Sequence, residues 1–157
     1  MVRNKDIHQA LARSYRLLQH RMRSTSEVRA RLLHAGFTED VVEEVVDTLT
    51  RQALLDDEAF ARSWTDERRR LNPRSSSLIR KELRYKGVAP ELVTRVTGDI
   101  DDDEVALELA QHRAESMRGM DRSTFLRRLS RYLYNRGFAH ATVARALIRV
   151  EQSRNVS

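Results

Sequence analysis

The sequence contains no cysteine, 5 glycines, 2 prolines and few aromatic residues. Without cysteine the chain forms neither a disulfide nor a thiolate metal site, and it lacks a cysteine nucleophile. Five glycines spread over 157 residues do not supply the phosphate-binding loop of a P-loop or Rossmann protein. These shortages argue against several classes of enzyme.

Long hydrophobic runs are also missing. No stretch of apolar residues is long enough to cross a bilayer, and the N-terminal segment "MVRNKDIHQALARSY" lacks the apolar centre of a signal peptide. We therefore expect a soluble cytoplasmic protein that does not contact membranes.

The third shortage is of strand signals. Runs of β-branched residues with strict alternation are absent, and glycine and proline rarely interrupt the chain. Charged residues make up 33% of the sequence, which leaves little apolar material for one large core. We expect an all-α fold with several small cores.

What the sequence has in excess is positive charge, with a formal net charge of +6. Lysine occurs only at Lys5, Lys81 and Lys86, so nearly all of this charge is arginine. Arginine forms bidentate hydrogen bonds with carboxylates as readily as with phosphates. The charge therefore suits a nucleic acid or an acidic protein surface, and part of it is expected to cover solvated helix faces.

One sequence motif, in which glycine is followed by a large apolar residue, occurs three times. Gly36, Gly87 and Gly137 stand 51 and 50 residues apart, and apolar residues recur at the same distances from each glycine. Leucine lies four residues before each glycine, at Leu32, Leu83 and Leu133. This spacing predicts a helix that ends at a left-handed glycine, followed two or three residues later by a new helix at Glu39, Pro90 or His140.

A longer helix is predicted before each of these pairs, over about 6–21, 57–70 and 103–117. The chain is thus expected to form three tandem three-helix repeats, at residues 1–52, 53–98 and 99–157, in an elongated, curved arrangement. Such arrays present a long exposed face, which favours a binding function.

Residues for catalysis are hard to find. The five histidines are scattered without the spacing of a helical zinc site, and the acidic run "DIDDDE" lacks the pattern of a calcium loop. The serines cluster at predicted helix starts, where N-capping explains them, and Ser24 with Glu27 three residues later has the pattern of a capping box. We expect no catalytic residue, no bound metal and no cofactor.

The charge is unevenly placed. Acidic residues dominate 37–60, whereas basic residues dominate 68–86 and 122–157. Arg80 and Arg84 share one helix face, as do Arg127 and Arg131. The candidate partner-binding or DNA-binding residues are Arg80, Lys81, Arg84, Lys86, Arg127, Arg128, Arg131, Tyr132, Tyr134 and Arg136. For the two tyrosines, packing over a repeat core and contact with a partner both remain open.

A helix-turn-helix that reads DNA is disfavoured, although a glycine between two helices in a basic protein resembles one. The helices after Gly36 and Gly87 open with Glu39 and Asp40 or with Glu91, and these carboxylates repel phosphates.

The ordered set of motifs resembles the RecX family of bacterial regulatory proteins. The resemblance rests on "GF" before an acidic helix, "LLDDEAFA", "KELRYKGV" and "LYNRGF", and it extends from about Ala10 to Val150. It implies tandem three-helix repeats and a non-enzymatic role as an inhibitor of the RecA recombinase. Members of the family bind along the groove of the RecA filament on single-stranded DNA and limit filament assembly, strand exchange and ATPase activity.

For this chain the resemblance predicts a monomer whose partner is the RecA filament, with contact to the single-stranded DNA within it. Two alternatives remain open. One is an autonomous basic nucleic-acid-binding protein that competes for single-stranded DNA. The other is a helical adaptor for a different protein.

Overall fold

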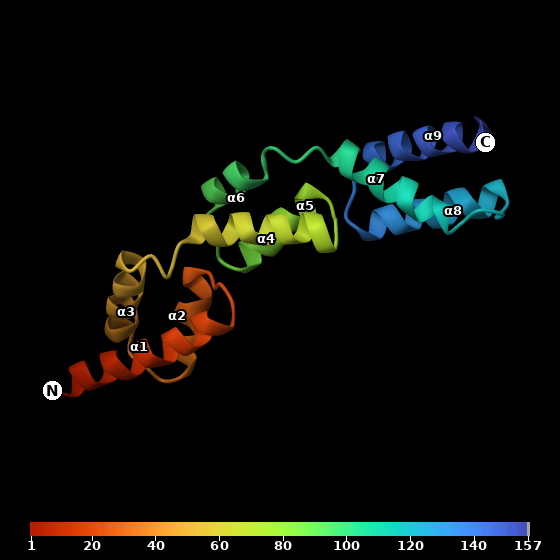
Figure 1. The fold of residues 1–157 in the computed structure, drawn as a ribbon. Coiled ribbons are helices and arrows are strands. Elements are labelled where there is room, and N and C mark those ends of the chain that lie inside the picture. Colours follow the sequence, from red (N-terminus) through yellow and green to blue (C-terminus); the bar gives the residue numbers. More distant parts are fainter. Residues whose placement is uncertain (157) are drawn as a thin grey trace. The chain divides into compact units, whose positions relative to one another are not determined.

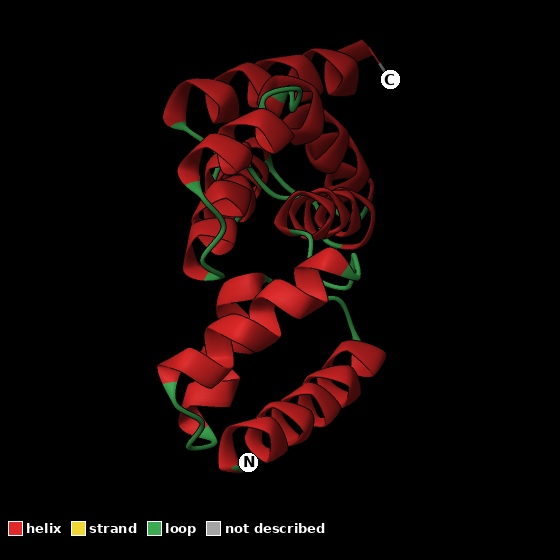
Figure 2. Cartoon of the chain, turned by 90° about the vertical axis from the view of Figure 1, so that its left-hand side faces the viewer, coloured by secondary structure: helices red, strands yellow, loops and turns green. Residues whose placement is uncertain are grey.

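The computed structural model describes residues 1–156, and within them the chain is helical and contains no strand (Figures 1 and 2). The all-α prediction is confirmed. The helices of these residues are α1 (Val2–His20), α2 (Thr25–His34), α3 (Glu39–Arg51), α4 (Asp57–Leu71), α5 (Ser76–Tyr85), α6 (Pro90–Thr97), α7 (Asp102–Glu115), α8 (Arg122–Asn135) and α9 (His140–Val156).

Each repeat has the three predicted helices, and in the first and second repeats the first helix is the longest, as predicted. In the third repeat that prediction is wrong, because α9 has 17 residues and α7 and α8 have 14 each. The predicted starts at Glu39, Pro90 and His140 are correct. The predicted start of α1 at Asp6 is wrong, because the helix begins at Val2. No glycine or proline stands in the first five residues to prevent this extension. We call α1–α3, α4–α6 and α7–α9 the first, second and third repeats.

Each repeated glycine ends its helix in the same way. Gly36, Gly87 and Gly137 have φ values of 96°, 81° and 88°, in the left-handed region that favours glycine. In the first copy, the N–H of Gly36 donates to the carbonyl of Leu33 at 3.0 Å, and that of Phe37 donates to Leu32 at 3.2 Å. The other two copies form the same pair of bonds. This is the Schellman arrangement, which satisfies carbonyls at the helix end.

The described residues divide into two compact units. The first unit contains Met1–Trp64 and Glu82–Val96. Its largest core lies in the first repeat, where α1 and α2 pack against α3. Val28 and Leu32 of α2 meet the apolar side of α3 there, including Val45 and Leu49, and all four are fully buried.

The second unit contains Thr65–Lys81 and residues 97–156. Its core lies in the third repeat, where α7 and α8 pack against α9. Phe125, Leu129 and Leu133 form the buried side of α8, with 0–1% of their surface exposed. The second repeat therefore contributes residues to both units. The elongated, curved arrangement of the repeats stays a prediction.

Candidate partner-binding surface

The N-terminus of α2 forms a joint with the second repeat inside the first unit. Ser24 and Glu27 form the predicted capping box, in which the Ser24 Oγ accepts from the Glu27 N–H at 3.1 Å. The same Oγ donates to the carbonyl of Lys86, next to Gly87, at 2.6 Å. Asp57 at the start of α4 accepts from the Thr25 N–H at 2.8 Å. The second repeat thus satisfies groups that the helix end leaves without an intrahelical partner.

An equivalent joint occurs in the second unit at the N-terminus of α5. The Ser75 N–H donates to the carbonyl of Arg136, next to Gly137, at 3.0 Å. Asp102 at the start of α7 accepts from both the N–H and the Oγ of Ser76, each at 2.8 Å. In both joints a carboxylate from the next long helix and a carbonyl before the next repeated glycine meet the helix end.

The N-terminus of α8 is different, because residues 1–156 contain no further repeat to contact it. Asp121, which is exposed, caps the helix with its own side chain and accepts from the Thr124 N–H at 3.0 Å. This hydrogen bond and one from the Thr124 hydroxyl lower the pKa of the Asp121 carboxyl. The third helix end is therefore complete within its own repeat.

The three candidate arginines of α8 lie on its solvent side. Arg127, Arg128 and Arg131 are exposed, opposite the buried Phe125 and Leu129. Arg127 lies close enough to Asp121 for its charge to contribute to the lowered pKa there. Within residues 1–156, Arg128 and Arg131 form no ion pair. These cations are available to a partner without any loss of internal contacts.

Three of the candidate residues make contacts within their own unit. The Nζ of Lys86 lies 3.5 Å from Glu27 and 5.4 Å from the centre of the Trp64 ring. Arg136 donates to the carbonyl of Pro73 at 3.0 Å and also to the side chain of Asn72. Its guanidinium stacks 4.8 Å from the Tyr132 ring, which has Arg113 at 5.3 Å as a second cationic neighbour. A partner would have to compete for these groups.

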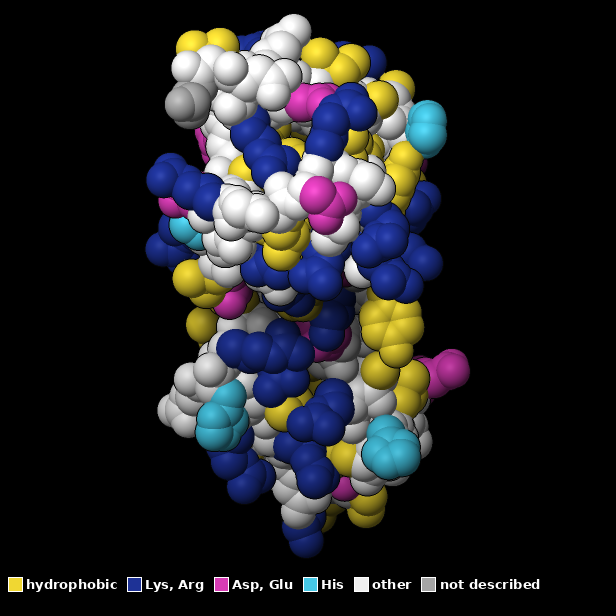
Figure 3. All heavy atoms as spheres, turned by 90° about the vertical axis from the view of Figure 1, so that its right-hand side faces the viewer, with side chains coloured by type: hydrophobic (Ala, Val, Ile, Leu, Met, Phe, Trp, Pro, Cys, Tyr) yellow, Lys and Arg dark blue, Asp and Glu magenta, His cyan; other side chains and the backbone are white. Residues whose placement is uncertain are grey.

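The remaining candidate residues are more accessible. Tyr134 is 42% exposed, and its hydroxyl hydrogen-bonds the Nδ1 of His140 while the two rings stack. On α5, Lys81 and Arg84 are exposed and Arg80 is half-buried. Lysine and arginine side chains predominate over acidic ones on the face drawn in Figure 3.

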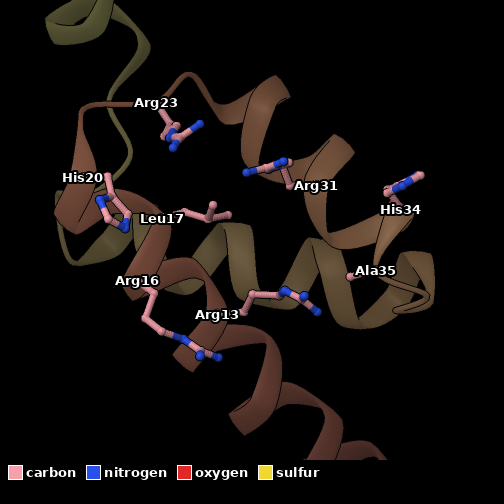
Figure 4. A pocket seen from close by; sticks show the side chains of 8 residues that line it. All are labelled: Arg13, Arg16, Leu17, His20, Arg23, Arg31, His34 and Ala35. Carbon is pink, nitrogen blue, oxygen red and sulfur yellow. The ribbon is translucent and has the colours of Figure 1, made fainter.

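The first repeat contains a cationic groove that the sequence analysis missed. It has a volume of about 420 Å³ and lies between α1, α2 and the loop that joins them. We call it the α1–α2 groove, and none of its lining residues is acidic. They are Arg13, Arg16, Leu17, His20, Arg23, Arg31, His34 and Ala35. Figure 4 shows Arg23 and Arg31 pointing toward each other above Leu17, with Arg16 and His34 directed away from them.

Arg23 is the most enclosed cation of the α1–α2 groove. Its Nε is buried and has no hydrogen-bond partner within residues 1–156. Burial is the main cause that lowers the pKa of this guanidinium, followed by the charge of Arg21, and Arg31 also lowers it. The carboxylate of Glu27 raises it in part, but Glu27 itself pairs with Arg21 and Lys86.

Other kinds of site are not seen in the described chain. Nowhere in residues 1–156 do three or more histidine, aspartate or glutamate side chains come together in a way that could hold a metal ion. The same residues include no helix with both the length and the apolar character needed to span a bilayer.

Comparison with protein families assigns every repeat to the same family. Models described as the first, second and third three-helix domains of RecX match residues 10–49, 56–96 and 101–147. The resemblance stated from the sequence is confirmed.

Curated relatives give the same result. A protein from Corynebacterium efficiens named regulatory protein RecX is 37% identical over 134 residues, which are 80% of this chain and 64% of that protein. This chain thus spans slightly less than two thirds of that relative. A protein of the same name from Chlorobium limicola is 30% identical over 93% of this chain and 92% of its own length.

Solved structures match in fold. RecX from Lactobacillus salivarius superposes with a TM-score of 0.81 at 18% identity, over 95% of this chain and 99% of that one. A second crystal structure, of regulatory protein RecX, gives 0.73 at 22% identity, over 90% of this chain and 71% of that one. At these identities the match establishes the fold of three helical repeats.

Proposed function

The chain belongs to the RecX family of regulatory proteins, and from this premise we propose that it binds the filament of a RecA recombinase on single-stranded DNA. Binding limits filament assembly and thereby reduces strand exchange and ATP turnover. The action is non-enzymatic and cytoplasmic, and the protein works as a monomer. The family membership supports the partner, and the exposed cations of α8 support the mode of contact.

The observation that carries the contact is the exposed arginine face of α8. Arg127, Arg128 and Arg131 stand opposite the apolar side that holds Leu129 and Leu133 in the core. Arginine loses little on leaving water at an interface and binds carboxylates or phosphates through two parallel hydrogen bonds. This face can therefore meet an acidic protein surface, DNA phosphates or both while the third repeat stays folded.

The cations of α5 add a second contact. Lys81 and Arg84 are exposed, and Arg80 is half-buried. Counted from the repeated glycine, Lys81 corresponds to Arg131 on α8, whereas Arg80 and Arg84 correspond to Ser130 and Tyr134. Two corresponding helices with cationic outer faces suit a partner that is itself repetitive, such as adjacent subunits of a filament.

A charge-reversal experiment tests the proposal. We expect wild-type protein to shorten recombinase filaments and lower their ATPase activity, and R127E/R128E/R131E to do so much less. The interface arginines of protein complexes are among the residues whose loss costs about 2 kcal/mol or more, so the inhibitory concentration should rise by roughly 30-fold or more.

The matched control reverses three exposed arginines of the same unit, in R69E/R118E/R149E. If both triple variants lose inhibition equally, net charge and not the α8 face is responsible. Unchanged inhibition by R127E/R128E/R131E would reject the site assignment. A wild-type protein with no effect on recombinase ATPase would reject the function itself and favour the adaptor.

The nucleic-acid competitor is the alternative that the cationic composition favours. It predicts that bare single-stranded DNA binds as tightly as a preformed filament, with an affinity that falls steeply as salt rises. Filament binding that exceeds binding to bare DNA by a wide margin at physiological salt supports the recombinase regulator.

A further inference from the structure

The α1–α2 groove concentrates cations without the acids that usually accompany them. Arg13, Arg16 and Arg31 make no ion pair within residues 1–156, and Arg23 keeps a buried Nε without a partner. By contrast, Arg29, which is also on α2 but does not line this groove, pairs with Glu43 at 2.7 Å. Burial of an unsatisfied donor is unfavourable, so the Nε of Arg23 is a position that a bound acceptor would stabilise.

The other repeats show that the fold does not require this charge. Counted from the repeated glycine, the position of Arg31 is taken by Glu82 in the second repeat and by Tyr132 in the third. In the long helices, buried Ala10, Ala61 and Ala106 mark one register. In that register, Glu67 and His112 take the place of Arg16. Arg74 keeps a cation at the place of Arg23 in the second repeat, but the full set of Arg16, Arg23 and Arg31 occurs in the first repeat alone.

The arrangement distinguishes between possible anions. Four arginines line one small groove, and the charges of Arg21 and Arg31 contribute, after burial, to the lowered pKa of Arg23, as expected for like charges close together. A single carboxylate would neutralise one of them, whereas linked phosphates carry several charges in a short length. Along α1, Arg13 and His20 are separated by seven residues, or roughly 10 Å of helix, so the groove extends beyond one phosphate group.

We propose that the α1–α2 groove is a binding site for linked phosphate groups. Arg23 and Arg31 bind one phosphate, and Arg13 and Arg16 extend the site along α1. Linked phosphates occur in a nucleic-acid strand and in a free polyphosphate or nucleotide. The site is formed by residues other than the arginines assigned to recombinase contact and does not depend on that assignment.

The test uses the full chain without recombinase and measures binding of two probes, inorganic tripolyphosphate and a thymidine oligonucleotide. The groove variant is R16E/R31E, which introduces the glutamates that the second repeat carries at these positions. The matched control is K5E/R51E, which removes the same formal charge from exposed residues of the first unit outside the groove. Thermal unfolding of all three proteins shows that they are folded.

We expect the groove variant to lose on the order of 100-fold in affinity, about tenfold for each charged hydrogen-bonding group removed, and the control to lose only a few-fold. The slope of log affinity against log salt for the oligonucleotide should fall by about one to two units. R23Q should weaken binding by about tenfold without reversing any charge.

The two probes distinguish the sources of phosphate. Groove-dependent binding of the oligonucleotide without binding of tripolyphosphate identifies a nucleic-acid strand, and groove-dependent binding of both identifies a site for compact polyphosphates as well. Equal losses in the groove variant and in the control would overturn the proposal. So would polyglutamate that binds the wild-type protein as tightly as the phosphate probes, because the groove would then be a site for an acidic peptide.

Discussion

The N-termini of α2 and α8 occupy the same place in their repeats, but they are capped in different ways. At α2, Ser24 caps its own helix and also donates to Lys86 of the next repeat, while Asp57 meets the neighbouring N–H. At α8, Asp121 caps the helix alone. A serine hydroxyl can accept and donate at once, whereas an ionised carboxylate only accepts. At α2 a single serine side chain therefore caps its helix and links two repeats, whereas at α5 the link to Arg136 comes from the backbone N–H of Ser75.

The repeated glycines show the same contrast from the other side of the joint. A Cβ at Gly87 would overlap the side chain of Ser26, and one at Gly137 would lie 2.6 Å from the Ser75 Oγ. A Cβ at Gly36 would meet nothing within 4 Å. All three glycines supply the left-handed conformation, but only Gly87 and Gly137 also let one repeat approach the helix of the repeat before it.

The largest predicted effect on stability distinguishes the two roles of these glycines, the left-handed backbone and the close approach of the preceding repeat. Gly36→Ala should cost about 1 kcal/mol of unfolding free energy, because only the left-handed backbone is strained. Gly87→Ala adds a clash with a side-chain carbon close to the backbone, and its total cost should be about 3 kcal/mol or more. Urea unfolding followed by circular dichroism measures both values.

A second substitution shows whether the clash is the cause. Ser26→Gly removes the atoms that a Cβ at position 87 would overlap, so the double variant S26G/G87A should be more stable than the sum of the two single effects predicts. Additive effects, or equal costs for Gly36→Ala and Gly87→Ala, would contradict the close approach.

A smaller effect is predicted for the carboxylates that contact helix ends. Asp102→Ala leaves two donors of Ser76 without an acceptor and should cost about 2–3 kcal/mol. Asp57→Ala leaves the N–H of Thr25 without its acceptor and should cost about 1.5 kcal/mol of unfolding free energy.

Asp121→Ala is the comparison at the self-capped end. The loss of an exposed N-cap should cost about 1 kcal/mol. Unfolding free energies in urea rank the three variants. A cost for Asp121→Ala that equals or exceeds the cost for Asp102→Ala would show that the joints add nothing to ordinary capping.

The repeated glycine motif illustrates which parts of the fold the sequence could predict. Its leucine at minus four and its large residue at plus one predicted the helix end, and the structure has the Schellman bonds from Phe37 to Leu32 and from Val88 to Leu83. These bonds are local, so the spacing of a few residues contains the necessary information. The capping box of Ser24 and Glu27 was predicted for the same reason.

The joints and the groove depend on residues that are distant in the sequence. Asp57 was predicted only as the first residue of its own helix, and its bond to Thr25, 32 residues earlier, has no local signal. Arg136 was assigned to a basic face, yet it contacts Asn72 and Pro73. For the groove, the spacing of Arg13, Arg16 and His20 was a visible signal, but its significance depends on the approach of α2.

The smallest predicted effect concerns pH at the joint of α2. Burial alone would raise the pKa of Glu27, but hydrogen bonds from Arg21 and from the Ser24 backbone, with the charges of Arg21 and Lys86, lower it overall. A carboxyl group whose pKa is lower in the folded state stabilises the protein above its unfolded pKa, near 4.5. That contribution disappears as the pH falls through the folded pKa.

Glu27→Gln removes this ionisation while keeping the shape of the side chain. The variant should be less stable than the wild type by about 0.5 kcal/mol at pH 7, as expected for a partly exposed ion pair, and the difference should shrink below pH 4.5. Urea unfolding at pH 7, 5.5, 4 and 3 measures it. Since Glu27 also holds Arg21 and Lys86 beside the cap, a difference that stays constant across this range would mean that the hydrogen bonds of the capping box, and not its charge, stabilise the joint.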